Sequence, residues 1–252
     1  MAIALTRALS PRISECELTY VSREPIDAVR AAAQHDAYER LLQKHGCTLV
    51  HVDPAPDHPD GVFVEDAAIV VDEVAVITRP GAESRRGETD SVAKVLARHR
   101  PLLQIEAPAT IDGGDVLRIG RKLFVGSGQR TNNDGIAQLR ICLAPFGYQV
   151  IATAFRGCLH LKSAVTMLDE KTLIFNPEWV DAISGFEMVA IDRAEPFAAN
   201  VLRLGEVVIA GAEQPRTNRL LEQRGYVVDT SAMSELLKAE AGVTCCSVVF
   251  EG

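Results

Sequence analysis

One unit recurs along this sequence: two short apolar runs joined by a polar turn. Such paired runs are typical of β-hairpins. The runs cover 66–78, 115–126, 163–175, 199–211 and 245–250. The last run lacks a second half, and the N-terminal segment 3–9 (IALTRAL) is the candidate that could supply it.

Segments with helical spacing of apolar residues follow several of these hairpins. We expect helices at 31–45, 88–99, 133–146 and 215–224. The helix at 88–99 would place Val92, Val95, Leu96 and His99 on one face. Three helices are followed by glycine and a new apolar run, at Gly46, Gly147 and Gly225. A glycine at that position lets the chain leave the helix in a left-handed conformation.

The hairpin starts are separated by 49, 48, 36 and 46 residues. A hairpin, helix and strand repeated at this period indicate a ring of units, each covering the apolar face of its neighbour. We therefore predict an α/β fold, a five-bladed propeller, as a single domain over residues 1–252. An ordinary α/β sheet remains an alternative, although the hairpins argue against an all-parallel one.

Composition narrows the possible partners and the compartment. The net charge is −8 and no basic cluster exceeds Arg85-Arg86, which disfavours nucleic acid and favours a small cationic ligand. The N-terminal apolar run is too short for a secretory signal, and no run approaches the length of a membrane span. Six cysteines are scattered without CxxC spacing, so we expect free thiols and a cytoplasmic protein without membrane partners. The oligomeric state, monomer or homodimer, stays open.

If the hairpin starts converge on one axis, the residues at these starts share a site. They are VFVED (62–66), IDGGD (111–115), LHLKS (159–163), AAN (198–200) and TCCS (244–247). Carboxylates, a histidine and a cysteine would then gather from separate units, as in a thiol-based active site.

Seven stretches, spread in order over nearly the whole chain, resemble the dimethylarginine dimethylaminohydrolases of the pentein superfamily. They are PDGVFVED, ITRPGAESRRGE, TIDGGDVL, GQRTN, LHLKS, AAN and GVTCCSV. The resemblance implies a five-bladed α/β propeller that converts Nω-methylated arginine to citrulline and an amine. It also implies that no metal or organic cofactor takes part.

Three catalytic positions follow from the resemblance. Cys245 corresponds to the nucleophile, His160 to the general acid and base, and Asp112 to the carboxylate that orients the histidine. Adjacent residues of a strand point to opposite faces, so we expect Cys245 to face the axis and Cys246 to pack behind it. Carboxylates near the thiol should raise its pKa until a cationic substrate reverses the local field.

The resemblance also assigns substrate-binding positions. Glu65 and Asp66 correspond to the ligands of the guanidinium group, and carboxylates suit its several N–H donors. Arg85 and Arg130 correspond to the arginines that bind the substrate α-carboxylate. The other positions are Asp60 and Ala239 at the α-amino group, Phe63 beside the reacting end, and Leu18 on a mobile lid.

Three alternatives remain. Arginine deiminases share the cysteine, histidine and carboxylates, but they have aspartate where this chain has Lys162. A lysine cannot accept hydrogen bonds from guanidinium nitrogens, so N-methylated substrates are favoured. A non-catalytic pentein binding protein would have no reason to keep these residues together. Zinc held by Cys245 and His160 would lack a third ligand.

Overall fold

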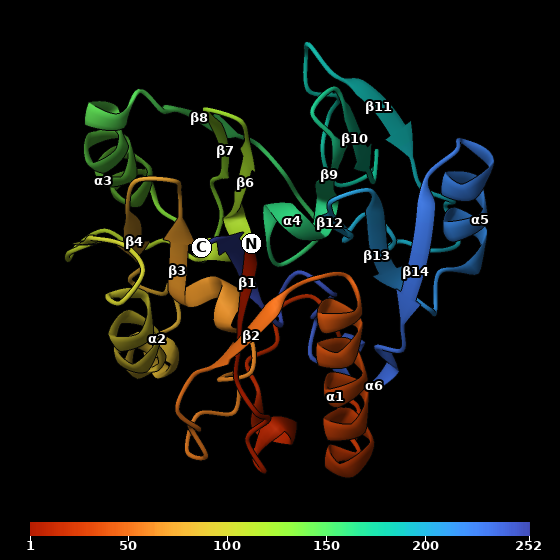
Figure 1. The fold of residues 1–252 in the computed structure, drawn as a ribbon, viewed down its shortest axis with the longest axis horizontal. Helices are drawn as coiled ribbons and strands as arrows, with labels where there is room; N and C mark the ends of the chain where they lie inside the picture. The colour runs from red at the N-terminus through yellow and green to blue at the C-terminus, as the bar shows by residue number, and fades with distance from the viewer.

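The computed structural model describes residues 1–252 and contains five three-stranded sheets around a central axis (Figure 1). Within each sheet the middle strand pairs antiparallel with one neighbour and parallel with the other. The first blade contains β3 (Ala68–Val70), β4 (Ala75–Ile77) and β5 (Leu102–Gln104), and the second contains β6 (Val116–Ile119), β7 (Lys122–Gly126) and β8 (Gln149–Thr153). The third contains β9 (Val165–Asp169), β10 (Thr172–Phe175) and β11 (Glu187–Ala190). The fourth contains β12 (Leu202–Leu204), β13 (Val207–Gly211) and β14 (Val227–Ser231). The predicted five-bladed α/β propeller is confirmed.

The fifth blade joins the two ends of the chain. It consists of β15 (Val248–Glu251), β1 (Ala2–Thr6) and β2 (Thr48–His51), in that order. β1 pairs antiparallel with β15, from Ala2 opposite Glu251 to Leu5 opposite Val248. The N-terminal run is therefore the missing half of the last hairpin, and this pairing closes the ring.

Four helices lie on the outside of the ring and link a middle strand to the third strand of its blade (Figure 1). They are α1 (Ala28–Lys44), α2 (Thr89–Leu96), α3 (Asn133–Leu143) and α5 (Pro215–Gln223). The third blade has no such helix. The helix predicted at 88–99 ends early, so His99 lies beyond it against the Phe250 ring. Gly46, Gly147 and Gly225 all have positive φ, as predicted.

Five buried apolar clusters hold the blades together. Each cluster takes residues from two neighbouring blades; Val76 of β4 and Leu123 of β7, for example, share one. Another cluster joins Ile209 of β13 to Ala4 of β1, across the closure of the ring. Because each blade covers the apolar face of the next, the ring buries its core without a central hydrophobic plug.

Short helical turns precede the inner strands, so the inner strands begin later than the sequence predicted. The turns are the 3-10 turns Val64–Ala67 and Gly113–Asp115, and the four-residue helix α4 (Leu161–Ala164). Cys245 and Cys246 also lie in a turn, since β15 begins at Val248. The strand argument for their opposite orientation was therefore wrong. A second short helix, α6 (Ser234–Leu237), packs near α1.

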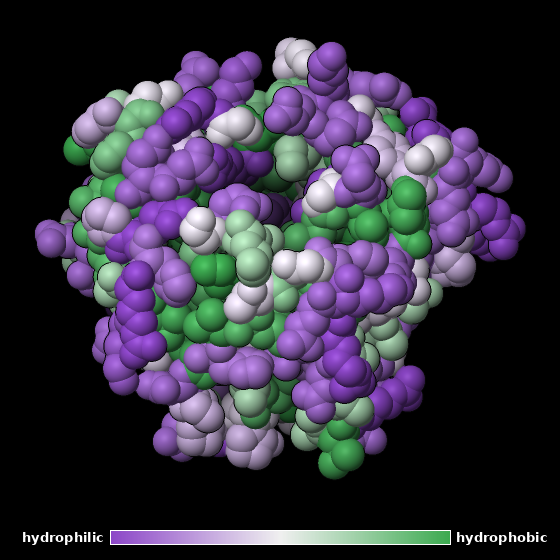
Figure 2. All heavy atoms as spheres, viewed as in Figure 1, coloured by the Kyte–Doolittle hydropathy of each residue, from purple (hydrophilic) through white to green (hydrophobic).

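Figure 2 shows a mostly hydrophilic periphery and a hollow near the centre of the viewed face. None of the helices has both the length and the apolar character needed to cross a bilayer.

Candidate active site

His160 lies between carboxylates from two other blades. Its Nε2 atom is 3.0 Å from Oδ2 of Asp112, and its Nδ1 atom is 3.8 Å from Oδ1 of Asp66. All three side chains are almost completely buried. His160 immediately precedes α4, Asp112 precedes the turn Gly113–Asp115, and Asp66 lies in the turn Val64–Ala67. The inner ends of three blades thus supply the cluster.

Two glycines permit this close approach. A Cβ atom on Gly114 would lie 2.5 Å from His160 Nδ1 and 2.7 Å from Asp66 Oδ1. A Cβ atom on Gly113 would lie 1.9 Å from the Glu65 carbonyl oxygen. Neither distance is tolerable, so the pair of glycines is a steric requirement of the site.

The carboxylates keep the imidazole protonated at neutral pH. Burial alone would lower the pKa of His160, but the charge of Asp66 and the hydrogen bond to Asp112 raise it to about 9. Asp66 responds in the opposite direction. Burial would raise the pKa of Asp66, but the positive charges of His160 and Arg85 hold it well below its usual range.

Glu65 and Asp66 are adjacent but have different partners. Glu65 accepts hydrogen bonds from Lys162 Nζ at 2.6 Å and Thr244 Oγ1 at 2.9 Å. Asp66 accepts from Arg85 Nη1 at 2.6 Å and from the Gly114 backbone N–H at 2.8 Å. Each carboxylate oxygen has a second lone pair, so both side chains can also accept bonds from a bound cation.

Cys245 is joined directly to this acidic segment. Its carbonyl oxygen accepts a hydrogen bond from the Glu65 backbone N–H at 3.3 Å, and its thiol lies 3.4 Å from the Gly242 nitrogen. Burial raises the pKa of the thiol, and the charges of Glu65 and Asp66 raise it further. The resting thiol is therefore protonated at neutral pH, as the sequence led us to expect.

Cys246 belongs to the same apolar cluster as Cys245. It is completely buried in the apolar cluster that contains Tyr38, Leu42 and Val243. All six cysteines are free thiols. In the turn, the Cys245 thiol lies 3.4 Å from the Gly242 nitrogen, and the Cys246 thiol lies 4.0 Å from the Gly242 carbonyl oxygen.

The two arginines predicted to bind the α-carboxylate differ in their surroundings. Arg85 is enclosed by acidic groups, with Asp66 on Nη1 and Glu88 bonded to Nε and Nη2. Arg130 is nearly as buried, but its Nη1 atom has no hydrogen-bond partner and lies 3.9 Å from Asp112 Oδ2. Arg130 therefore offers a buried donor to an incoming anion, whereas a ligand would have to share Arg85 with Asp66 and Glu88.

The remaining predicted positions lie near segment 17–21, which we call the lid after the role that the resemblance implies for Leu18. The lid contains Leu18, which is half-buried and packs against the cluster that also holds Phe63, Ala239 and Cys245. Asp60 accepts from the Glu17 backbone N–H at 3.1 Å. Burial raises the pKa of Asp60 to about 6, although the charge of Arg85 opposes this.

Sequence reasoning missed Glu240, which holds the lid. Its carboxylate accepts hydrogen bonds from three consecutive backbone N–H groups, those of Thr19, Tyr20 and Val21. Glu240 is the one residue other than glycine with a positive φ, at 59°. That conformation is costly for a side chain with a Cβ, and no motif in the sequence indicated it.

Sequence reasoning also assigned no role to Asn200, although AAN lies at a hairpin start. Its side-chain amide donates to the Lys162 carbonyl and to Thr244 Oγ1, both at 3.0 Å, and accepts from the Thr244 N–H at 3.0 Å. Asn200 thus ties the turn of Cys245 to the blade that carries His160.

The oxygen and nitrogen atoms of Asp66, Asp112 and His160 lie within 4.8 Å of one another, close enough to hold a metal ion. These atoms already have partners: Asp66 is paired with Arg85, and Asp112 accepts from His160 and the Gly81 N–H. A cation would also have to displace the proton of His160. The donor set therefore fits proton transfer better than metal binding.

Comparison with known proteins identifies the family. A family model described as arginine deiminase matches residues 50–197. The dimethylarginine dimethylaminohydrolase of Streptomyces coelicolor is 44% identical over 246 residues, which cover 97% of this chain and 95% of the relative. The chain belongs to the dimethylarginine dimethylaminohydrolase family. It is therefore an amidino hydrolase of the pentein superfamily, and the family, fold and enzyme class predicted from the motifs are confirmed.

Solved structures of this family have the same architecture. A cysteine-to-serine variant of the Pseudomonas aeruginosa enzyme, complexed with citrulline, superposes with a TM-score of 0.92 at 32% identity, covering 98% of both chains. A histidine-to-glycine variant of a dimethylarginine dimethylaminohydrolase, described as an adduct with S-methyl-L-thiocitrulline, gives a TM-score of 0.93 at 32% identity, covering 99% and 100%.

Proposed function

We propose that this enzyme hydrolyses asymmetric dimethylarginine and monomethylarginine to citrulline plus dimethylamine or methylamine. The observation that carries the proposal is the position of Cys245 beside Glu65, next to the Asp66–His160–Asp112 cluster. The carboxylates suit a guanidinium cation, the thiol supplies a nucleophile, and the imidazolium supplies a proton. The relatives named above bear the same activity in their names.

The proposed substrate pose follows from the charges. The guanidinium lies against Glu65 and Asp66, and the α-carboxylate pairs with Arg130, whose Nη1 atom lacks a partner.

Arg85 assists as a second positive charge near the α-carboxylate, and Asp60 and the Ala239 carbonyl receive the α-amino group. Phe63 lies beside the reacting end of the substrate, and Leu18 covers its aliphatic part.

The proposed reaction has two steps. In the first, the Cys245 thiol releases its proton to bulk water, the sulfur forms a bond to the guanidinium carbon, the carbon–nitrogen bond to the methylated nitrogen breaks, and His160 gives its proton to the departing amine. In the second, His160 takes a proton from water, the hydroxide oxygen bonds to the same carbon, and the carbon–sulfur bond breaks. The new hydroxyl group gives its proton to the departing sulfur, so citrulline leaves and the thiol is restored.

The substrate itself would activate the nucleophile. Glu65 and Asp66 raise the pKa of Cys245 in the resting enzyme. A bound guanidinium neutralises their charge, so the thiol can lose its proton when the target carbon is in place. The Cys245 thiol therefore stays protonated and unreactive while no substrate is bound.

Lys162 separates this proposal from arginine deimination. Its Nζ atom is bonded to Glu65 at 2.6 Å, at the position where a deiminase would have an aspartate. A cation here cannot bind an unsubstituted guanidinium nitrogen, which leaves that side to methyl groups.

The test is incubation of the purified protein with asymmetric dimethylarginine, monomethylarginine and arginine in separate reactions, with citrulline and amine measured in each. We expect citrulline from the methylated substrates and little from arginine. Turnover of arginine alone would contradict the substrate assignment. The cytoplasmic location expected from the sequence stays a prediction.

A further inference from the structure

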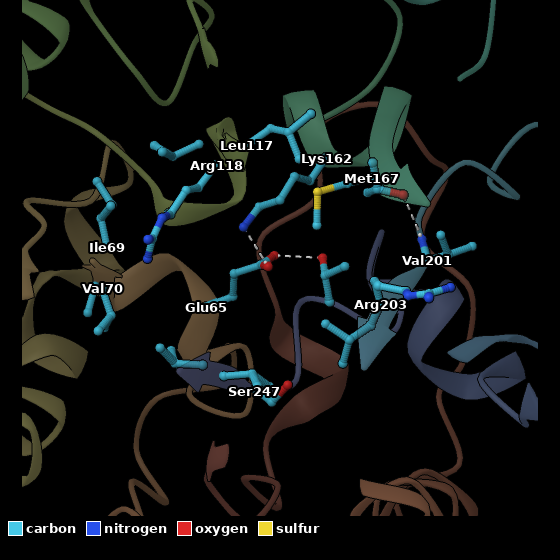
Figure 3. A pocket seen from close by; sticks show the side chains of 18 residues that line it. Glu65, Ile69, Val70, Leu117, Arg118, Lys162, Met167, Val201, Arg203 and Ser247 are labelled. Carbon is cyan, nitrogen blue, oxygen red and sulfur yellow. Dashed lines mark hydrogen bonds and ion pairs between the residues drawn. The ribbon is translucent and has the colours of Figure 1, made fainter. Parts of the chain in front are cut away.

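A cavity of about 290 Å³ lies beside the active site and is not part of it. Its lining includes Glu65, Lys162 and Thr244 but not Cys245 or His160. Figure 3 shows the Glu65–Lys162 bond in the middle of the view, and Glu65 also accepts a hydrogen bond from Thr244. The cavity and the active site therefore share these side chains as a common wall.

The sides of the cavity are apolar and come from the inner strands of all five blades. The apolar lining residues are Ala68, Ile69, Val70, Val116, Leu117, Met167, Val201, Leu202, Val248 and Val249. The cavity therefore lies in the central channel of the propeller, and its lining does not include the nucleophile. A concave apolar site with a few polar groups is typical of small-molecule binding.

The charged lining of the cavity is mainly basic. It includes Arg118, Lys162 and Arg203 but only one acid, Glu65. This excess of positive charge is notable in a chain with a net charge of −8. Figure 3 shows Arg118 and Arg203 on opposite sides of the cavity. The local charge favours an anion over a cation.

Arg203 has the less committed guanidinium group. Arg118 donates to Asp72 at 2.7 Å and to the Gly120 carbonyl at 3.2 Å. The nearest acidic oxygen to Arg203 is that of Glu206, at 3.6 Å, on a side chain that is 96% exposed. Arg203 itself is only 18% exposed. A mostly covered guanidinium with one loose, solvated partner is prepared to bind a carboxylate.

We propose that this cavity binds a small aliphatic monocarboxylate, with the carboxylate on Arg203 and the hydrocarbon chain along the apolar strands. An inorganic anion would leave the apolar walls in contact with water, and an aliphatic ammonium ion would meet the excess positive charge. This consequence rests on the proposed function: if Glu65 binds the substrate, a ligand in the cavity changes the affinity of the active site for substrate. Substrate then changes the affinity of the cavity for that ligand by the same factor.

Methionine methyl groups provide the test. The chain has four methionines, and Met167 lines the cavity, whereas Met188 belongs to the outer strand β11 and Met233 to the cluster around Cys245. Hexanoate is titrated into the intact protein carrying ¹³C-methyl methionine, and Met167→Leu assigns the signal. We expect a saturable shift of the Met167 methyl signal alone, and no shift with hexylammonium.

Matched variants decide the role of the arginine. Arg203→Gln should weaken hexanoate binding roughly tenfold, about 1.4 kcal/mol. Arg121→Gln is the control, because Arg121 is paired with Glu73 and does not line the cavity. The proposal would be overturned if hexanoate left the Met167 methyl signal unchanged, or if it shifted the Met233 signal and not that of Met167. It would also be overturned if Arg203→Gln bound hexanoate as tightly as the native protein. The measurement needs no turnover, so such a failure would leave the proposed reaction untouched.

Discussion

The Nε2 atom of His160 lies 3.0 Å from Oδ2 of Asp112, and both residues are buried from solvent. This bond fixes which ring nitrogen remains for the substrate: Nδ1, the atom that faces Asp66. The same contact, together with the charge of Asp66, raises the pKa of the imidazole against the effect of burial.

The pH dependence of the reaction should follow this pKa. Because the protonated His160 is the acid in the first step, kcat/KM should fall as the pH rises through about 9. Asp112→Asn removes a charge and a partner that raise the pKa, so the fall should begin at lower pH, and the rate at neutral pH should drop about 10²-fold. The measurement is kcat/KM against pH for both proteins. An unchanged alkaline limb in Asp112→Asn would contradict this role.

The sign of the accompanying stability effect can be worked out. His160 has a higher pKa in the folded protein than the ordinary value of 6.5, so its contribution to folding is fully present below about pH 6.5. That contribution is lost as the pH rises from there through about 9. Urea denaturation at pH 6 and pH 9.5 should therefore show lower stability at the higher pH for the native protein.

The neighbouring cysteines should respond differently to the same substitution. Cys245→Ala should lower citrulline production by roughly 10⁴-fold or more, because no other thiol can attack from its position. Cys246→Ala should keep activity within a few fold and lose roughly 1 kcal/mol of stability, since it is fully buried among apolar side chains. Steady-state kinetics and urea denaturation of both variants make the comparison. Comparable loss of activity in the two would contradict the assignment.

The thiol of Cys245 should be unreactive in the free enzyme. Burial and the charges of Glu65 and Asp66 raise its pKa, so alkylation by iodoacetamide should be slow at neutral pH. Glu65→Gln removes one of these charges and should speed alkylation by lowering the pKa. The rate specific to Cys245 is obtained by subtracting the rate of Cys245→Ser, which retains the other five thiols. Fast alkylation of the native enzyme at neutral pH would contradict the proposal of substrate activation.

Release of the lid should weaken substrate binding. The Glu240 carboxylate accepts hydrogen bonds from the backbone N–H groups of residues 19–21. Glu240→Gln removes the negative charge, which weakens these bonds, and it adds an NH₂ group that has no acceptor there. We expect KM to rise about tenfold, or about 1.4 kcal/mol, with faster proteolysis in 17–21. Glu213→Gln is a matched control, because Glu213 accepts a hydrogen bond from the Met233 N–H and makes no hydrogen bond with the lid. Equal effects of the two changes would contradict a specific role for Glu240.

The sequence by itself determined the ring. The hairpin period, the glycines that end the helices and the apolar N-terminal run are local patterns, and local patterns are sufficient where each unit packs only on its neighbours. The order of the motifs also indicated which residue types meet at the axis. The pairing of His160 with Asp112 came from the resemblance to the family, and the structure places the two side chains 3.0 Å apart.

Tertiary structure alone decided the partners within the site. Lys162 and Thr244 are 97 and 179 residues from Glu65 along the chain, and yet both bond its carboxylate. Whether Arg85 or Arg130 retains a free donor depends on acids contributed by other blades. Glu240 combines a positive φ with a side chain that accepts hydrogen bonds from three N–H groups of the lid, 219–221 residues away. The partner of each side chain in the site thus depends on which distant segments are buried against one another and on the charges that they carry. A local sequence pattern contains no information about either.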